Sequence, residues 1–412
     1  MEREAVLVGI DAGTTKVTTL IGEVGRGGDV NIIGYGTVPS AGLKKGMVAN
    51  IDQTVQSIAG SLERAERHSG YKISSAFVSV GGSHISSQNS RGVVAVSGPK
   101  REVSREDVHR ATEAARAVQV PSNREVLHVV PRGYIVDGQD GIKDPIGMSA
   151  VRLEVETHIV AGAATSVQNL TKCIHQSNVQ IDELVISSLA AGEATLTDTE
   201  KELGVLVADI GGGTTDIAVF VDGAVYHTAV LPVGGNNVTN DVAIGLRTSL
   251  NLADEIKIKH GSADLNQVQP EELLNVAQLG DGGGQTIQRR KLCEIIEARM
   301  SEIYSLIREE VKASGHAGML PAGMVLTGGA ARLAGSAELA RDVLEMPVRV
   351  GPPQGVGGLM DQLGNPAFAT PIGLLLWGAR HLGGDQIGPP MRQPAGTGVG
   401  RFVGWLRGLF PA

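Results

Sequence analysis

The segments Asp11-Ala-Gly-Thr-Thr-Lys16 and Asp209-Ile-Gly-Gly-Gly-Thr-Thr-Asp216 are near repeats of one another. Each follows an apolar run, residues 6–10 or residues 205–208, so each predicts a β-strand, a tight glycine turn and a second strand. Glycine permits the backbone angles of such a turn and lets amide N–H groups crowd around an anion. A carboxylate at a strand end suits a hydrated Mg²⁺ ion. Two such hairpins that face each other would hold the phosphates of a nucleotide from both sides.

The composition indicates a folded chain with more than one core. Its 412 residues are 42% hydrophobic but only 3% aromatic, so aliphatic side chains must fill the cores. The net charge of −8 argues against non-specific binding to nucleic acid. Cys173 and Cys293 stand in no metal-ligand or Cys-x-x-Cys spacing, which favours reduced thiols in a cytosolic protein. We expect no signal peptide, because Asp11 interrupts the first apolar run, and no membrane-spanning helix.

The order of predicted elements occurs twice along the chain. The first half of the sequence predicts four strands, at residues 6–10, 17–24, 30–38 and 73–80. An amphipathic helix is predicted before the last of them, at residues 52–68. The second half predicts three strands and a helix, at residues 205–209, 215–221, 225–231 and 236–250. A third glycine turn, Thr327-Gly-Gly-Ala330, follows a strand at residues 323–326, and a buried helix at residues 369–379 closes the fold. The repeated order indicates an internal duplication of a lobe.

Two insertions interrupt this duplication. The first carries strands at residues 126–130 and 151–155 and a helix at residues 104–119, with Ser104 as the expected N-cap. The second is helix-rich, with a glycine loop at residues 280–284 and a long amphipathic helix at residues 287–312. We therefore expect an α/β protein with two core lobes, two insertions, a flexible linker and a terminal helix. The first core lobe takes residues 1–82 and 161–200, and the second takes residues 201–250 and 319–382. The first insertion takes residues 83–160, the second residues 251–318, the linker residues 383–399 and the terminal helix residues 400–412.

The C-terminal segment is typical of a helix that lies in the plane of a membrane surface. On a helical wheel its large apolar side chains fall in one arc of roughly 160°, with Arg401 and Arg407 outside it. These side chains are Phe402, Val403, Trp405, Leu406, Leu409 and Phe410. Burying each is worth roughly 1.5–3 kcal/mol, against about 1 kcal/mol for each Arg near an anionic surface, so hydrophobic insertion should dominate. The alternative is a tail helix that docks on the protein's own core or on a partner, and the linker speaks against it.

The glycine turns resemble those of the actin-like ATPase superfamily, which includes actins, heat-shock chaperone ATPases and sugar kinases. The resemblance covers both hairpins, an adenosine turn at residues 327–332 and two interdomain helices around residues 190–193 and 371–373. It implies the actin-like two-lobed fold with duplicated ribonuclease-H-like cores, two inserted subdomains and ATP with Mg²⁺ between the lobes. The nucleotide contacts that it implies are Gly13, Thr14, Thr15, Lys16, Gly211, Gly212, Gly213, Thr214, Gly234, Gly235, Asn236, Asp254, Lys257, Gly328 and Gly329.

By the same resemblance, Asp11 and Asp209 hold Mg²⁺ through water, and the alternative of a turn-capping Asp is disfavoured by their matched contexts. Superfamily members place Glu-x-x-Lys beside the ribose and adenine, whereas this chain has the shorter Asp254 before Lys257. Phosphoryl transfer needs little beyond positioning and charge, so a carboxylate that orients water suffices for weak hydrolysis. Glu193 on the first interdomain helix is the candidate, together with Asp209, and its alternative is an ordinary solvated helix residue.

Four further segments resemble the FtsA family of bacterial cell-division proteins. They are Gly81-Gly-Ser-His-Ile-Ser-Ser-Gln-Asn-Ser-Arg-Gly92, His128-Val-Val-Pro-Arg-Gly-Tyr134, Gly141-Ile-Lys-Asp-Pro-Ile-Gly-Met148 and Ile256-Lys-Ile-Lys-His-Gly261. The resemblance spans nearly the whole chain. It implies a filament-forming protein at the division septum, on the cytoplasmic face of the plasma membrane. It also implies that the first insertion meets filament neighbours and late division proteins, that the second binds the C-terminal peptide of FtsZ, and that the terminal helix binds anionic lipid.

Other members of the superfamily remain as alternatives. A sugar kinase or similar weak phosphotransferase would need a catalytic Asp in a substrate cleft, and no second motif supplies one. A heat-shock chaperone would carry a substrate domain after the ATPase, where this sequence has only a tail. A pilus-assembly relative shares the first insertion, and the amphipathic tail speaks against it. Whether the chain is an enzyme stays open: we expect at most a weak ATPase that serves mainly as a nucleotide-binding scaffold.

Overall fold

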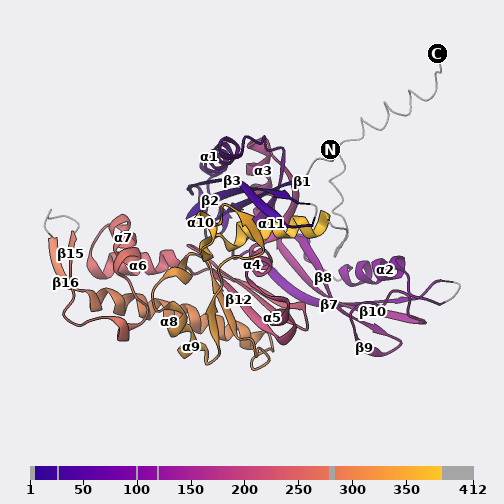
Figure 1. Cartoon of the computed structure of the whole chain (residues 1–412). Coiled ribbons are helices and arrows are strands. Elements are labelled where there is room, and N and C mark those ends of the chain that lie inside the picture. Colours follow the sequence, from indigo (N-terminus) through magenta and orange to yellow (C-terminus); the bar gives the residue numbers. More distant parts are fainter. Residues whose placement is uncertain (1–4, 26, 99–100, 118–119, 278–283, 383–412) are drawn as a thin grey trace, which may run out of the picture.

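Two sheets with matching strand order form the centre of the molecule (Figure 1). The computed structural model describes residues 5–25, 27–98, 101–117, 120–277 and 284–382. The first sheet contains, in spatial order, β11 (Gln180–Ile186), β6 (Ser75–Val80), β1 (Ala5–Ala12), β2 (Lys16–Val24), β3 (Val30–Pro39) and β19 (Val356–Gly358). The second contains β14 (Ala224–Leu231), β13 (Thr215–Val221), β12 (Val205–Ile210), β17 (Met324–Thr327) and β18 (Val348–Val350). In both sheets three antiparallel strands continue into parallel ones, so the predicted duplication is confirmed.

Both faces of the first sheet are buried, because apolar side chains alternate along its strands. On β1, Val8 and Ile10 pack on one side and Leu7 on the other. The helices α1 (Ile51–Ser69) and α3 (Ala164–Gln176) cover the first face. The interdomain helices α4 (Ser187–Thr195) and α11 (Ala369–Leu382) cover the second, and they pack against each other between the two sheets (Figure 1).

The second lobe carries α6 (Gly235–Leu246), α7 (Leu250–His260), α8 (Arg289–Ala313) and α9 (Ser336–Leu344). The predicted single helix at residues 236–250 is wrong in extent, because Arg247 adopts a left-handed φ of 50° and Ser249 caps a new helix. The long helix at residues 287–312 is confirmed from Arg289 onward, whereas Ile287 and Gln288 belong to a strand. That strand, β16 (Gly284–Gln288), pairs with β15 (Leu273–Ala277) in a hairpin that the sequence analysis did not predict. Most of the glycine loop between them lies outside the described residues.

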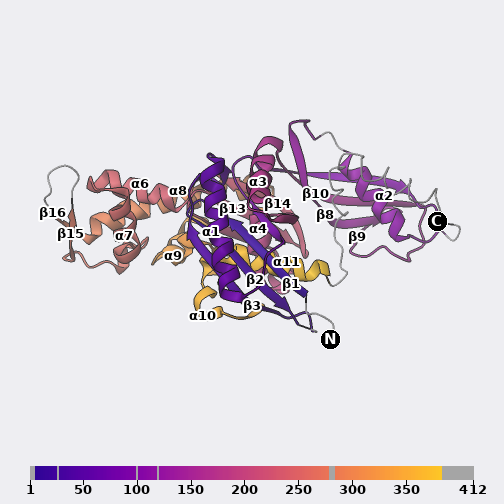
Figure 2. The same cartoon turned by 90° about the horizontal axis from the view of Figure 1, so that it is seen from above.

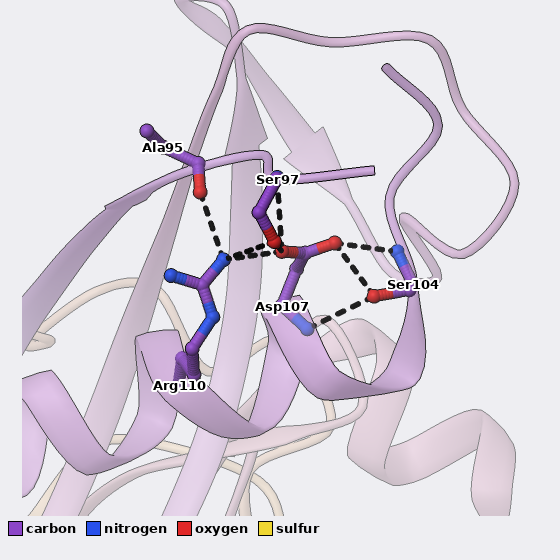
Figure 3. Close-up of polar contacts among 5 residues, drawn as sticks. All are labelled: Ala95, Ser97, Ser104, Asp107 and Arg110. Carbon is purple, nitrogen blue, oxygen red and sulfur yellow. Dashed lines mark hydrogen bonds and ion pairs between the residues drawn. The ribbon is translucent and has the colours of Figure 1, made fainter. Parts of the chain in front are cut away.

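The first insertion is a four-stranded sheet covered on one face by a helix (Figure 2). Its strands are β7 (Ser86–Ala95), β10 (Arg152–Ala163), β8 (Arg124–Val136) and β9 (Gln139–Ile142), and its helix is α2 (Arg105–Arg116). The helix starts after Ser104 as predicted, in a reciprocal capping arrangement with Asp107 (Figure 3). Asp107 is fully buried and also accepts from Arg110 and Ser97, which ties α2 to the end of β7. These hydrogen bonds outweigh burial and hold the pKa of Asp107 well below its usual range.

Short elements complete the described chain. They are β4 (Leu43–Lys44), β5 (Met47–Val48), α5 (Asp198–Leu203), α10 (Met360–Leu363) and three single-turn 3₁₀ helices at Leu265–Gln267, Gly329–Arg332 and Pro366–Phe368. Among the helices of the described ranges, none has the length and apolar character that crossing a bilayer requires. The predicted linker and the six apolar residues of the terminal helix lie outside the described residues.

Candidate nucleotide site

The two glycine hairpins meet tip to tip between the sheets. Asp11 lies opposite Thr18 in the first hairpin, and Asp209 lies opposite Asp216 in the second. The second turn packs so tightly on the first that a methyl group added to Gly213 would lie 2.6 Å from Thr14 Oγ1. Such a distance is far inside van der Waals contact, so the second turn accepts only glycine at this point.

One hydrogen bond closes both turns in the same way. The Gly13 N–H donates to the Lys16 carbonyl at 3.1 Å, and the Gly211 N–H donates to the Thr214 carbonyl at 2.9 Å. Within the ranges that the structure covers, the N–H groups of Thr14, Thr15, Gly212 and Gly213 in these turns donate to no protein acceptor. Free N–H groups from two facing turns make a cradle for an anion such as a phosphate chain.

Two carboxylates stand at the strand ends beside the turns. Ser79 Oγ donates to Asp11 Oδ1 at 2.7 Å, and Thr370 Oγ1 donates to Asp209 Oδ2 at 2.6 Å. Burial raises the pKa of Asp11, although the Ser79 hydrogen bond opposes the rise. Burial, reinforced by the charge of Asp11, raises the pKa of Asp209 to about 6 against the opposing Thr370 hydrogen bond. The charge of Lys16 offsets the effect of burial only in part, so the pair lacks positive charge that a divalent cation would supply.

Asp216 is a third carboxylate in this site, and the sequence reasoning did not single it out. Its Oδ2 accepts from Thr214 Oγ1 at 2.9 Å, whereas its Oδ1 is buried without a hydrogen-bond partner. Burial together with the charge of Asp209 raises the pKa of Asp216 to about 8. The sequence held a signal for Asp216, because the two hairpins differ at this position: the second has a carboxylate where the first has the uncharged Thr18.

Asp216 lies beside the start of α4 at a point where the backbone of Gly81 comes close. A methyl group on Gly81 would lie 3.0 Å from Asp216 Oδ1 and equally far from Ser187 Oγ. Ser187, the first residue of α4, therefore faces the same small space as the unpartnered carboxylate oxygen. A hydroxyl and a carboxylate of high pKa at one spot are groups that can orient a water molecule and take its proton.

Lys16 and Phe368 form a cation–π contact at the mouth of the site. Lys16 Nζ lies 3.6 Å from the centroid of the Phe368 ring. Burial lowers the pKa of Lys16, although Asp11 and Asp209 act in the opposite direction. The ammonium thus lies near the carboxylates but forms no hydrogen bond to them within the described part of the chain, so it can contact a phosphate.

The residues present fit a hydrated cation better than one enclosed by side chains. Across the described ranges, no three His, Cys, Asp or Glu side chains gather in a group that could hold a metal ion. Mg²⁺ usually keeps several waters and takes one or two carboxylates plus phosphate oxygens. Asp11 and Asp209, beside four free amides, match that requirement.

The residues predicted for the sugar and base extend this site into the second lobe. The N–H groups of Gly235 and Asn236 donate to the carbonyls of Gly211 and Gly212, so the start of α6 is tied to the second turn. Gly234 packs against the same carbonyls. Gly328, with φ of 86°, lies against Asp209, where a methyl group would approach the carboxylate to 2.2 Å. Gly329 follows it and begins a 3₁₀ turn.

Asp254 and Lys257 form one polar cluster with Thr239 of α6. Lys257 Nζ donates to Asp254 Oδ1 and to Thr239 Oγ1, both at 2.7 Å. Burial acts to raise the pKa of Asp254, but the ammonium of Lys257 lowers it below its usual value. The two residues therefore lie beside the N-terminal turn of α6, and Lys257 also approaches the Gly235 carbonyl at 3.4 Å.

Glu193 is not among the residues that gather at the turns. Its carboxylate lies 3.2 Å from Lys201 Nζ and 2.7 Å from an Arg380 nitrogen, and its side chain is 9% exposed. It lines a separate groove of about 450 Å³ with Leu196, Gln354 and residues of α11. Glu193 is not an ordinary solvated helix residue, because its carboxylate pairs with Lys201 of α5 and with Arg380 of α11.

Comparison with known proteins gives consistent matches. The family described as "Cell division protein FtsA" matches residues 206–373, and the "SHS2 domain inserted in FTSA" matches residues 82–161. Proteins named cell division protein FtsA are similar over most of their length. That of Pseudomonas aeruginosa is 44% identical over 90% of this chain and 89% of its own, and that of Neisseria meningitidis is 42% identical over 97% and 98%. That of Bacillus subtilis is 41% identical over 96% and 89%.

Solved structures with this fold are actin-like proteins of low sequence identity. A type IV pilus biogenesis complex of PilM and PilN matches with a TM-score of 0.65 and 17% identity, over 90% of this chain and 98% of that one. MreB5 of Spiroplasma citri, bound to ADP, matches with a TM-score of 0.55 and 13% identity, over 93% and 99%. These likenesses confirm the actin-like fold predicted from the glycine turns. Proteins of this superfamily generally bind a nucleotide with a divalent metal ion.

Proposed function

This chain belongs to the FtsA family of cell-division proteins, and from that premise we propose that it binds ATP with Mg²⁺, forms filaments and ties FtsZ to the division septum. The observation that carries the nucleotide part is the pair of facing turns. Their free amides on Thr14, Thr15, Gly212 and Gly213 are the complement of a phosphate chain.

We assign the binding roles from the geometry of the two hairpins. The four amides donate to the β- and γ-phosphate oxygens, and Lys16 leaves Phe368 to add its charge. Asp11 and Asp209 accept hydrogen bonds from the waters of Mg²⁺, which when bound neutralises charge on the phosphates. Gly234 and Gly328 let the backbone pack closely on the second turn and on Asp209, and Gly329 has open space beside it. We place the ribose there, near the cluster of Asp254 and Lys257.

For slow hydrolysis we propose Asp216 rather than Glu193 as the group that, in its ionised form, accepts the proton of water. Its Oδ1 is buried, unpartnered and beside Ser187 Oγ, which would hold the same water molecule by a hydrogen bond. The two cations that bind the Glu193 carboxylate leave it engaged elsewhere. Scaffolding remains the main activity in this proposal, and hydrolysis is an accessory one.

The partners follow from the family and from the terminal segment. The second-lobe insertion would bind the C-terminal peptide of FtsZ, and the first would contact later division proteins. Phe402, Val403, Trp405, Leu406, Leu409 and Phe410 would enter the cytoplasmic leaflet of the plasma membrane. One copy of so short a helix binds weakly, whereas many copies on one filament bind strongly through avidity.

Co-sedimentation with anionic vesicles tests the membrane part of the proposal. Trp405→Glu places a charge in the apolar arc and should leave most of the protein in the supernatant. Gly404→Glu adds the same charge on the polar side of the wheel and serves as the matched control. If both variants sediment as the wild type does, the tail does not bind lipid. A nucleotide titration on the same samples keeps this outcome separate from the nucleotide site.

A further inference from the structure

The inserted sheet touches the second lobe directly, outside the nucleotide site. Ser87 Oγ on β7 donates to the Thr228 carbonyl on β14 at 2.8 Å, and Asn89 Nδ2 donates to the Tyr226 carbonyl at 3.3 Å. His158 on β10 joins the two strands, with Nε2 3.0 Å from Thr228 Oγ1 and Nδ1 2.8 Å from Asn89 Oδ1. Figure 2 shows β14 beside the strands of the insertion.

This contact is a specific one because its polar groups are buried. His158 is 1% exposed and Thr228 is 2% exposed, so their polar groups have lost water and depend on these hydrogen bonds in its place. Next to them the Arg132 guanidinium stacks on the Tyr226 ring, 3.6 Å from its centroid. A buried polar network of this kind is either fully formed or costly, so the insertion and the second lobe should stay together when the lobes move.

A second contact anchors the insertion at the hinge between the lobes. His128 Nε2 on β8 accepts from the N–H of Ile186, the residue just before α4, at 3.2 Å. The same imidazole ring lies edge-on to Trp377 of α11, with centroids 5.4 Å apart. The insertion therefore contacts both interdomain helices near its base and the second lobe farther along its strands.

Two connections link the insertion to the nucleotide site. Thr228 and Val230 on β14 pair with Ala218 and Asp216 on β13, so the contact strand lies next to the one that carries the third carboxylate. The chain also enters the insertion through Gly81, which packs on Asp216 and Ser187. A change in the position of the second lobe relative to the first would therefore act on the insertion both through β14 and through Gly81.

We propose that the inserted subdomain is a lever that follows the second lobe and transmits the nucleotide state to its own exposed end. That end carries the exposed apolar side chains of Val93, Ile146 and Val151. The inference rests on the proposed binding of nucleotide. Because coupling between sites is reciprocal, a partner that favours one position of the lever changes the affinity for ATP by the same factor.

Distances between two spin labels test the lever. Labels go on Cys substitutions at exposed Asp140 of β9 and exposed Glu63 of α1, while Cys173 and Cys293 are buried and stay unlabelled. Addition of Mg²⁺ with a non-hydrolysable ATP analogue should shift the distance distribution in the wild type. A parallel titration with a fluorescent ATP analogue reports binding itself, so a failure of nucleotide binding is seen separately from a failure of the lever.

Matched variants identify the contact that carries the movement. Thr228→Val removes the hydroxyl that meets His158 and should abolish the shift while ATP affinity changes less than twofold. Thr157→Val makes the same change on a buried hydroxyl whose hydrogen bond, to the Ser90 carbonyl, lies within the inserted sheet, and should keep the shift. Ser87→Ala, a milder change at the same interface, should reduce it. A wild type that binds nucleotide without any shift, or a full shift in Thr228→Val, would overturn the lever.

Discussion

The two glycine hairpins share one backbone and differ in their side chains. Both place an Asp at the end of the first strand and close the turn with the same N–H to carbonyl bond. The first hairpin then supplies Lys16 and an uncharged Thr18, whereas the second has Thr214 and Asp216 at the matching positions.

The difference separates binding from chemistry. What the hairpins share, free amides and one strand-end carboxylate each, is what a symmetric grip on phosphates and a hydrated cation needs. They differ in two groups: the first hairpin alone has the ammonium of Lys16, and the second alone has the carboxylate of Asp216. Substitutions at shared positions should therefore abolish binding, and substitutions at divergent positions should change affinity or rate only.

The largest effect should follow from filling the shared contact between the turns. Gly213→Val places side-chain atoms where Thr14 lies, between the facing turns, so it displaces the turns from the arrangement in which their amides converge on one anion. We expect ATP affinity to fall by about 100-fold or more, because most of the charge-assisted hydrogen bonds are lost together. Titration calorimetry with Mg²⁺ and ATP measures this.

Gly60→Ala is the control for that substitution. Gly60 lies inside α1, and an added methyl group would meet only Val38 at an ordinary 3.6 Å. It should bind ATP as the wild type does. Unchanged affinity in Gly213→Val would show that the hairpins do not hold the phosphates.

The next effect should fall on hydrolysis alone. Asp216→Asn removes the proton acceptor but keeps its size, so turnover should drop by about 100-fold with little change in ATP affinity. Thr18→Val alters the matching residue of the first hairpin, whose hydroxyl lies 3.3 Å from the Thr37 hydroxyl, and should leave turnover unchanged. Phosphate release at saturating ATP measures both, and equal turnover in the two variants would contradict the assignment of Asp216.

A smaller effect should follow when the first hairpin is given the residue of the second. Lys16→Thr removes the ammonium that lies near Asp11 and Asp209 and leaves the amides in place. We expect ATP affinity to fall about tenfold, in line with a charged hydrogen bond worth roughly 1.5 kcal/mol. The loss should shrink for ADP if Lys16 contacts the γ-phosphate. A loss as large as that of Gly213→Val would mean that charge, not the amide cradle, dominates binding.

The smallest effect concerns stability without nucleotide. The pKa of Asp216 is raised from 3.8 to about 8, so between these values the folded chain keeps a proton that the unfolded chain has lost. The stability contributed by that proton is present at acid pH and is lost as the pH rises toward 8. Asp216→Asn should therefore unfold with a free energy higher than wild type by at least about 1 kcal/mol at pH 8. The difference should vanish near pH 4, and denaturant titrations at both pH values measure it.

The sequence predicted the parts of the fold that depend on local pattern. Apolar runs before Asp11 and Asp209 and the glycines after them were enough to predict both hairpins, because strand and turn preferences act within a few residues. Helix ends were less predictable. Nothing in the apolar pattern at residues 236–250 shows that Arg247 turns left-handed, although Ser249 is of a residue type that caps the start of a helix.

The site was harder to predict where contacts join distant segments. The environment of Asp216 depends on Gly81 and Ser187, which lie far away in the sequence and come together through the sheet order. The position of Glu193 depends in the same way on Lys201 and on Arg380 near the end of α11. The sequence analysis proposed Glu193 and not Asp216, and only the surroundings of the two carboxylates separate them.

The most direct test is a crystal structure grown with Mg²⁺ and a non-hydrolysable ATP analogue. The account predicts one nucleotide, with its β- and γ-phosphates between the amides of Thr14 and Thr15 on one side and those of Gly212 and Gly213 on the other. Electron density for the analogue at another place, or hairpins that stay in contact with no phosphate between them, would contradict it.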